Sequence, residues 1–281
     1  MRYQRIASSG HLCLSPNYGR GFDTMNTTTK IILGTGIIAL LWSGVALAQD
    51  AAEAPSFQPV EMFSCNYNKG KGARDLDRAV AKFNEWSDAN DPTGYTAWTL
   101  TPQYFNADIT FDVAWLGAWS DHAAMGSNTD SYVSKGATVQ AGFDRALTCD
   151  SHIGAQAVVV KPPQNAAPPA TGIVMFSSCT LAEGVGPADA FAAHVAWAKY
   201  LDGKGSKVAT WNFYPGLGTG TMDFDYYVVN AYGNYADLAA TTEILTNGGG
   251  WMEAAKIFAG VVSCDGPRVY DSKLRRNGSG S

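Results

Sequence analysis

The chain has 281 residues, carries a formal net charge of −5 and is 46% hydrophobic. An acidic surface repels phosphate groups, so this balance argues against nucleic acid as a partner and against electrostatic binding to an anionic membrane. The apolar content is sufficient to bury one large core or two moderate ones.

The beginning of the chain predicts export. Residues 1–24 show no sustained hydrophobic period and precede a second methionine, Met25. From Met25 the pattern is typical of a signal peptide, with a polar start, an apolar run over 31–42 and a small-x-small cleavage motif at 46–48. We expect 25–48 to be the signal peptide and 1–24 a non-native or removed extension. The apolar run is too short to span a bilayer, so the mature protein is expected in the periplasm or outside the cell without a membrane span.

Shifts in composition divide the rest of the chain. Residues 49–59 form an Ala/Pro/Glu linker, and residues 161–171 form a Pro/Ala linker that holds neither a helix nor a strand ladder. The second linker separates two segments of similar length, 60–160 and 172–271. Residues 272–281 are basic and then rich in Gly and Ser, so we expect a disordered tail there.

The two segments open on nearly the same apolar strand, Met-Phe-Ser-Cys at 62–65 and Met-Phe-Ser-Ser-Cys at 175–179. Each cysteine is followed by a glycine-bearing loop and then by a helix. The two helices begin at Ala73 and Pro187 and align at a constant offset. The chain is therefore predicted to be a tandem duplication.

Hydrophobic periodicity predicts the same elements in each segment. In the first segment, strands are expected at 61–65, 96–104, 109–120 and 153–160, with helices at 73–86 and 130–147. In the second segment, strands are expected at 175–179, 208–215, 221–232 and 268–270, with helices at 187–201 and 237–262. The order β-α-β-β-α-β is the ferredoxin-like arrangement, an antiparallel sheet with helices on one face.

Large aromatic side chains alternate along the third strand of each segment. They are Phe111, Trp115 and Trp119 in the first and Phe224, Tyr226 and Tyr232 in the second. The face of a ferredoxin-like sheet that its helices leave open needs a cover. The simplest solution packs the two sheets against each other through these aromatic faces.

This element order resembles the dimeric α+β barrel superfamily, in which two ferredoxin-like units close sheet to sheet, here as a pseudo-dimer within one chain. The resemblance covers about residues 60–271 and includes no signature motif. It implies an α+β fold of two tandem ferredoxin-like repeats. Members of that superfamily include cofactor-independent monooxygenases and haem-binding or haem-degrading proteins. Because one chain supplies both halves, we expect a monomer.

The cysteines predict two disulfides. Apart from Cys13, which precedes the expected cleavage site, the chain has Cys65, Cys149, Cys179 and Cys264. No closely spaced Cys/His cluster is present, so a metal site is not expected. In a ferredoxin-like sheet the end of the first strand lies beside the start of the fourth, which pairs Cys65 with Cys149 and Cys179 with Cys264.

Motifs for catalysis are absent: the sequence has no Gly-x-Ser-x-Gly, His-Glu-x-x-His or P-loop. His122 and His152 lie near predicted strand ends and are expected to be solvated. His194 lies on the sheet-facing side of a helix, where the first segment has Val80. Two interpretations of His194 remain: a hydrogen-bonded core histidine, or a haem ligand or general base.

Two further pairs recur in both segments. Asp112 and Asp225 each follow a phenylalanine, and they either do acid/base work or accept hydrogen bonds that hold a strand. Trp98 and Trp211 each stand four residues before a proline, and they either fill the core or line a ligand cavity.

Three functions from different classes remain. We expect a secreted or periplasmic, non-catalytic protein that binds a small apolar or aromatic ligand in an aromatic-lined cavity between the sheets, without a cofactor. The candidate ligand-binding residues are Trp98, Trp115, Trp119, Trp211, Phe111, Phe224, Tyr226, Tyr232 and His194. One alternative is a cofactor-independent monooxygenase or a haem-binding or haem-degrading enzyme, which leaves haem open as a cofactor. The other is a structural or interaction module with a fully packed core.

Overall fold

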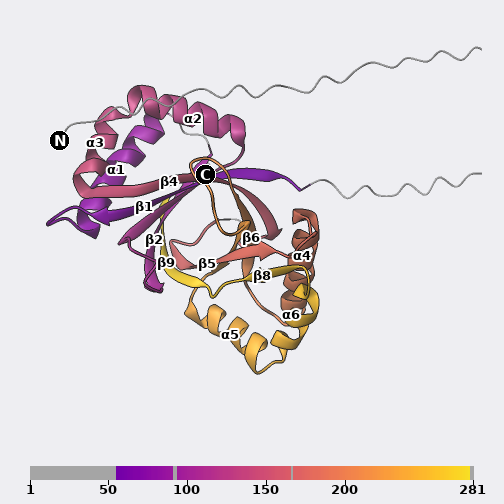
Figure 1. Ribbon diagram of the computed structural model, residues 1–281. Coiled ribbons are helices and arrows are strands. Elements are labelled where there is room, and N and C mark those ends of the chain that lie inside the picture. The colour runs from indigo at the N-terminus through magenta and orange to yellow at the C-terminus, as the bar shows by residue number, and fades with distance from the viewer. Residues whose placement is uncertain (1–54, 91–93, 166, 279–281) are drawn as a thin grey trace, which may run out of the picture. The chain divides into compact units, whose positions relative to one another are not determined.

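The computed structural model describes residues 55–278, apart from 91–93 and 166 (Figure 1). The predicted extension and signal peptide lie outside the described residues. Among the residues that are described, no helix is long and apolar enough to cross a membrane.

Strands and helices follow one another in two similar series. The first series comprises β1 (Phe57–Tyr67), α1 (Ala73–Asn90), β2 (Tyr95–Tyr104), β3 (Val113–Trp119), α2 (His122–Lys135), α3 (Ala137–Ala146) and β4 (Leu147–Lys161). The second comprises β5 (Thr171–Leu181), α4 (Pro187–Gly203), β6 (Ala209–Pro215), β7 (Tyr226–Tyr232), α5 (Tyr235–Thr246), α6 (Gly250–Phe258), β8 (Val262–Cys264) and β9 (Arg268–Arg276).

Within the described residues, eight antiparallel strands close into one barrel. Their order is β7-β6-β4-β1-β3-β2-β9-β5, and pairing of β5 with β7 completes the ring. The mixed α+β class and the barrel are thus as expected, although the halves do not form two separate sheets. They join edge to edge, β4 with β6 and β2 with β9, so hydrogen bonds close both seams. The duplication itself stays a prediction.

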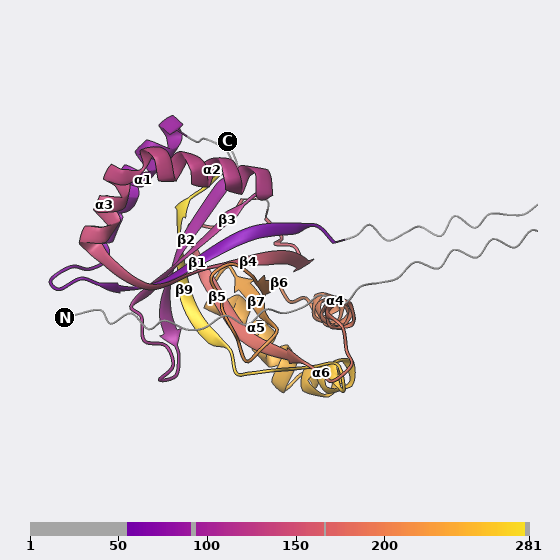
Figure 2. The same cartoon turned by 45° about the horizontal axis from the view of Figure 1, so that its top comes forward.

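The helices cover the outer face of the barrel strands. Figures 1 and 2 show α1, α2 and α3 over the first-half strands, and α4 and α6 over the second-half strands. In α1 the buried residues recur at helical spacing and include Leu76, Val80 and Phe83. Asp75 in its first turn accepts a hydrogen bond from the Gly72 backbone at 3.2 Å, which fixes the start of the helix.

Four large aromatic side chains lie on the opposite face of their strands from the one predicted. The core inside the barrel takes Ala114, Leu116 and Val229 from β3 and β7, whereas the aromatics pack on the helix side. These aromatics are Trp115, Trp119, Tyr226 and Tyr232. Alternate strand residues point to opposite faces, so these four aromatics lie on the helix side while Ala114, Leu116 and Val229 face the interior. The interior also holds large rings from other positions, among them Phe176, Phe213 and Tyr270.

Trp115 shows how its helix-side layer is organised. Its indole N–H donates to the Tyr95 hydroxyl at 2.6 Å, and Tyr95 in turn donates to Glu61 Oε1 at 2.6 Å. The Tyr95 ring lies over Gly117, where a Cβ would collide with it. Glycine at 117 is therefore required by this close approach.

Both predicted disulfides are present, Cys65 with Cys149 and Cys179 with Cys264. Cys65 is the cross-strand partner of Cys149 on β1 and β4, and Cys179 is the partner of Cys264 on β5 and β8. The pairing and the strand order behind it are confirmed.

The predicted disordered tail at 272–281 is wrong for its first half. β9 continues to Arg276, pairing with β2 along one edge and with β5 along the other. Lys273 and Arg275 both donate to Asp77 Oδ1 on α1, at 3.2 and 2.6 Å. The basic residues that suggested a solvated tail are thus held by an acidic partner that is remote in sequence.

Other boundaries differ by a few residues or by a break. β1 begins at Phe57, inside the predicted linker 49–59. β3 begins at Val113, four residues later than expected. The helical segments predicted after each hairpin are divided, the first at Gly136 and the second at Gly249, whose φ of 76° favours glycine.

We expect β9 to be indispensable for the barrel. A chain that ends at Pro267 would leave one edge of β2, and the part of β5 from Thr171 to Phe176, without a partner, and unpaired edges promote association. It should lose its cooperative thermal transition and elute as aggregates in size-exclusion chromatography. A chain that lacks only 279–281 is the matched control and should melt like the full protein. Equal melting of the two truncated chains would contradict this role.

Candidate functional site

A cleft of about 1000 Å³ opens at one end of the barrel. Its inner wall includes Leu100, Ala114, Phe176 and Tyr270, which also belong to the core inside the barrel. Its rim includes Tyr104, whose side chain is exposed. The two halves thus contribute to one cavity, and the barrel is not packed solid at this end.

Aromatic rings form much of the wall. Phe111 lies parallel to Tyr270 with ring centres 6.2 Å apart. Phe176 contacts Tyr227 and Tyr270 edge to face, each at 5.9 Å, and Phe224 lies 4.5 Å from Tyr227. Such a wall offers both ring faces and ring edges to a flat apolar ligand.

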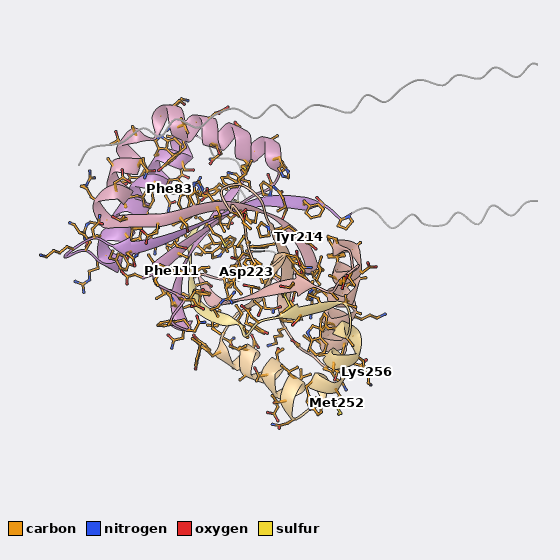
Figure 3. All side chains as sticks on the ribbon, in the orientation of Figure 1. Phe83, Phe111, Tyr214, Asp223, Met252 and Lys256 are labelled. Carbon is orange, nitrogen blue, oxygen red and sulfur yellow. A yellow bond between two sulfur atoms is a disulfide. The ribbon has the colours of Figure 1, made fainter. Side chains whose placement is uncertain are left out.

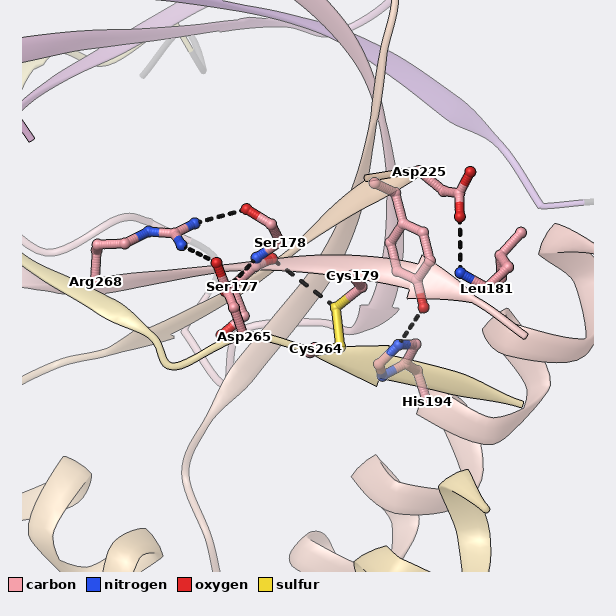
Figure 4. Close-up of a disulfide and its surroundings, with 10 residues drawn as sticks. Ser177, Ser178, Cys179, Leu181, His194, Asp225, Cys264, Asp265 and Arg268 are labelled. Atoms are coloured by element: carbon pink, nitrogen blue, oxygen red, sulfur yellow. Dashed lines mark hydrogen bonds and ion pairs between the residues drawn. A yellow bond between two sulfur atoms is a disulfide. The ribbon is translucent and has the colours of Figure 1, made fainter. Parts of the chain in front are cut away.

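A charged cluster lies within this aromatic wall (Figure 4). Arg268 Nη2 donates to Ser178 Oγ at 3.0 Å, and Nη1 donates to Asp265 Oδ2. Asp265 Oδ1 accepts from the Ser178 backbone at 2.7 Å, so the three residues hold one another. The guanidinium is mostly sheltered, with 16% of the Arg268 side chain exposed.

The cleft as a whole is acidic. Asp108, Asp223 and Asp265 line it. Among the described residues of the lining, Arg268 is the single lysine or arginine. Figure 3 labels Phe111 and Asp223, which line the cleft from the first and the second half of the chain. The cleft therefore disfavours ligands that arrive with a negative charge.

Two tyrosine hydroxyls face the same cluster. Burial raises the pKa of Tyr227 and of Tyr270, and the nearby Arg268 offsets part of each increase. Both hydroxyls are therefore protonated at neutral pH and act as hydrogen-bond donors.

The charged cluster forms where a strand is interrupted. β8 and β9 both pair with the same edge of β5, and residues 265–267 leave the ladder between them. Pro267 has no backbone N–H to give to a ladder. The interruption brings Asp265 and Arg268 together at the cleft.

Arg268 occupies a position that is apolar in the first half. It pairs with Phe176, three residues before Cys179, whereas Ile153 pairs with Met62, three residues before Cys65. Both Ile153 and Arg268 line the cleft. The cation is thus a feature of the second half alone at this register position.

The structure brings few of the predicted ligand-binding residues to the cleft. Phe111 and Phe224 line it. Trp98 and Trp211 pack against the core inside the barrel but are not part of the cleft lining. The other candidates, Trp115, Trp119, Tyr226, Tyr232 and His194, lie on the helix side. Their role in ligand binding stays a prediction.

His194 is a core histidine. It is 5% exposed, its Nε2 lies 2.8 Å from the Tyr226 hydroxyl, and its ring centre lies 5.0 Å from that of Phe258. Burial lowers the pKa of His194 to about 4, so its imidazole is neutral at pH 7.

The described lining of the cleft offers no histidine to a haem. Haem in proteins needs an axial ligand, most often a histidine. None of the described residues that line the cleft is a histidine, and Tyr226 already engages Nε2 of His194 on the opposite face of the sheet. The alternative that His194 is a haem ligand is therefore not supported by its surroundings.

The other two histidines in the described part of the chain are exposed, as expected. His152 Nε2 lies 2.9 Å from Glu61 Oε2, and its ring stacks on Phe63 at 3.7 Å. His122 Nε2 lies 2.7 Å from Gln156 Oε1. Neither lines the cleft.

Asp112 and Asp225 hold strand ends. Asp112 Oδ2 accepts from the Tyr67 backbone at 2.9 Å, and Asp225 Oδ2 accepts from the Leu181 backbone at 2.7 Å. Their own backbone N–H groups donate to the carbonyls of Cys65 and Cys179. The recurrence of the pair therefore reflects a shared requirement of the two halves.

The charged cluster and its neighbours were not among the predicted site residues. They are Ser178, Asp223, Tyr227, Asp265, Arg268 and Tyr270. One signal was available. The Asp-Gly-Pro run at 265–267 directly precedes the expected last strand at 268–270, and the arginine after it stands where the first half has an isoleucine.

No protein-family model matches the sequence, and no curated protein matches it either. Among solved structures, an anthrone oxidase-like protein is 10% identical, with 79% of this chain and 94% of that chain covered and a TM-score of 0.49. A chlorite dismutase from Candidatus Nitrospira defluvii is 9% identical, with 77% of this chain and 90% of that chain covered and a TM-score of 0.46.

These comparisons correct the expected function. Both descriptions refer to enzymes or enzyme-like proteins, whereas the sequence led us to expect a non-catalytic binding protein. That expectation is contradicted by these descriptions. Because the TM-scores lie under 0.5, the likeness identifies no reaction for this chain.

We expect His194 to make folding stability depend on pH. Its ordinary pKa of 6.5 is lowered to about 4 in the folded protein, so the unfolded chain takes up a proton first as the pH falls. Stability is then fully present above pH 6.5 and declines by about 3 kcal/mol towards pH 4. Urea unfolding at several pH values should show this decline in the wild type and a smaller decline in His194→Val. If the unfolding free energies of the wild type and of His194→Val fall equally as the pH is lowered, His194 is not the source of the decline.

Proposed function

We propose that the protein is an enzyme that binds a neutral, electron-rich aromatic molecule of the phenol class in the barrel-end cleft and oxidises it with molecular oxygen. The observation that carries this proposal is the sheltered guanidinium of Arg268 within the aromatic wall of an otherwise acidic cleft. The proposed reaction is that of the cofactor-independent monooxygenase alternative.

The lining supports this substrate class. Rings such as Phe111, Phe176 and Tyr270 provide faces and edges for stacking against a flat ligand. The three carboxylates of the lining disfavour a substrate that is already an anion. A neutral phenol satisfies both conditions, and its hydroxyl can reach the polar cluster.

The same residues supply acid/base and electrostatic functions. Asp223 is exposed in the cleft and would accept the phenol proton as a general base. Arg268 would stabilise the phenolate oxygen that results, while Ser178 and Asp265 hold the guanidinium in place. A phenolate gives up electrons to oxygen more readily than a phenol does.

The overall reaction balances without another reductant. The ring carbon opposite the hydroxyl loses its hydrogen and gains one oxygen atom, and the second oxygen atom leaves as water. The phenol is oxidised by four electrons to a quinone, and O₂ is reduced by the same four electrons.

We also propose that the protein is exported and monomeric. Two disulfides fit the periplasm or the exterior of the cell, where thiols are oxidised. The two seams that a dimer of half-barrels would form lie within one chain, which supports both the monomer and the predicted duplication. Light scattering of the purified protein tests the monomer.

Oxygen consumption tests the proposed reaction. With a panel of naphthols and anthracenols, the wild type should consume oxygen and release the quinone in equal amounts. Arg268→Ile, which copies Ile153, should reduce kcat/KM by about 10²-fold or more, and Asp223→Asn should do so by about 10²-fold. Asp130→Asn changes an exposed carboxylate on α2 and should leave the rate unchanged.

The outcomes separate the reaction from the fold. Near-ultraviolet circular dichroism should be the same for all variants, and Arg268→Lys should recover part of the lost rate because it restores the charge. The proposal is abandoned if no member of the panel is oxidised, or if a folded Arg268→Ile variant keeps the wild-type rate.

A further inference from the structure

Three side chains of metal-binding type meet on the helix side of β5. The ligand atoms of Cys179, His194 and Cys264 all lie within 4.8 Å of one another. Figure 4 shows His194 on one side of the disulfide and Arg268 on the other. In the oxidised protein the two sulfur atoms are bonded to each other, so this cluster holds no thiolate.

The other disulfide provides an internal comparison. Cys65 and Cys149 occupy the same strand positions in the first half. In the first half, Val80 of α1 packs in the core cluster with Cys65. In the second half, His194 of α4 lies beside Cys179 and Cys264 instead. The fold therefore does not require a histidine beside this disulfide, and the second half has one in addition.

We propose that reduction of the Cys179–Cys264 disulfide creates a Cys₂His site for a zinc ion. A dithiol reductant supplies two electrons and two protons, the S–S bond breaks into two thiols, and the reductant becomes a disulfide. Zinc then replaces the two thiol protons and binds both sulfur atoms and one imidazole nitrogen. This inference is independent of the proposed reaction.

The distances suit a zinc ion. With Zn–S bonds of about 2.3 Å and tetrahedral angles, two sulfur ligands lie roughly 3.8 Å apart. The sulfur atoms would therefore separate by roughly 2 Å on leaving the disulfide, which side-chain rotation allows. The Tyr226 hydroxyl at 2.8 Å from Nε2 would orient the ring, and Nδ1 would bind the metal.

The cleft gives access to this site. Cys179 is 0% exposed, whereas Cys264 is an exposed residue and lines the cleft. A reductant and a metal ion can therefore approach through Cys264. The fourth position of the zinc would be open to water from the same side, as it is in zinc sites that carry three protein ligands.

Metal titration of the reduced full-length protein tests the site. We would treat the protein with a phosphine reductant without oxygen, titrate it with Co²⁺ as a spectroscopic probe, and measure Zn²⁺ affinity by competition with a chromophoric chelator. The Cys65→Ser/Cys149→Ser variant, which keeps the proposed site, should bind one equivalent of Co²⁺ with a thiolate charge-transfer band. Zinc should bind this variant in the same ratio.

The matched variants decide the outcome. Cys179→Ser/Cys264→Ser keeps the other thiol pair beside Val80 and should bind zinc at least about tenfold more weakly. His194→Val, which copies the first half, should weaken binding by a similar factor and shift the Co²⁺ spectrum. Equal affinity of the two thiol pairs or an unchanged spectrum in His194→Val would overturn the proposal. Failure of the reduced protein to bind the probe, whether it stays folded or not, would do so as well.

Discussion

Closure of the barrel is the constraint on which the rest of the structure depends. Hydrogen bonds join β2 to β9 and β4 to β6, so every strand of the ring has two neighbours within the chain. Closure leaves no free edge in the ring and fixes a narrow interior. Along β3, Ala114 and Leu116 face that interior, whereas Trp115 and Trp119 pack under the helices. The cleft is the end of the barrel where the interior is not packed solid.

Much of the fold could be predicted because local signals agreed. The repeated strand that ends in cysteine, the helices at equal spacing and the cysteine positions together gave the strand order and both disulfides. The face of each strand could not be assigned in the same way. Period-2 alternation shows that Trp115 and Leu116 point to opposite sides, but the side that faces the interior depends on the size of the cavity, which only the closed barrel sets.

The site was harder to predict than the fold for a related reason. Phe111 and Phe224 could be chosen because they recur, whereas Arg268 matters because it does not recur. A search for features common to both halves finds what the fold needs, as with Asp112 and Asp225. Residues that differ at matching positions, Ile153 with Arg268 and Val80 with His194, show where the two halves are not equivalent. Both differences lie beside the same disulfide.

The place of β9 in the chain has a consequence for biosynthesis. β9 follows every other strand of the ring in the sequence, yet it lies between β2 and β5. During synthesis from the amino end, one edge of β2 and most of one edge of β5 therefore stay unpaired until β9 emerges. Over that interval the half-formed ring resembles a sheet that is open to other chains, and a chaperone that shields strand edges would be of most use then.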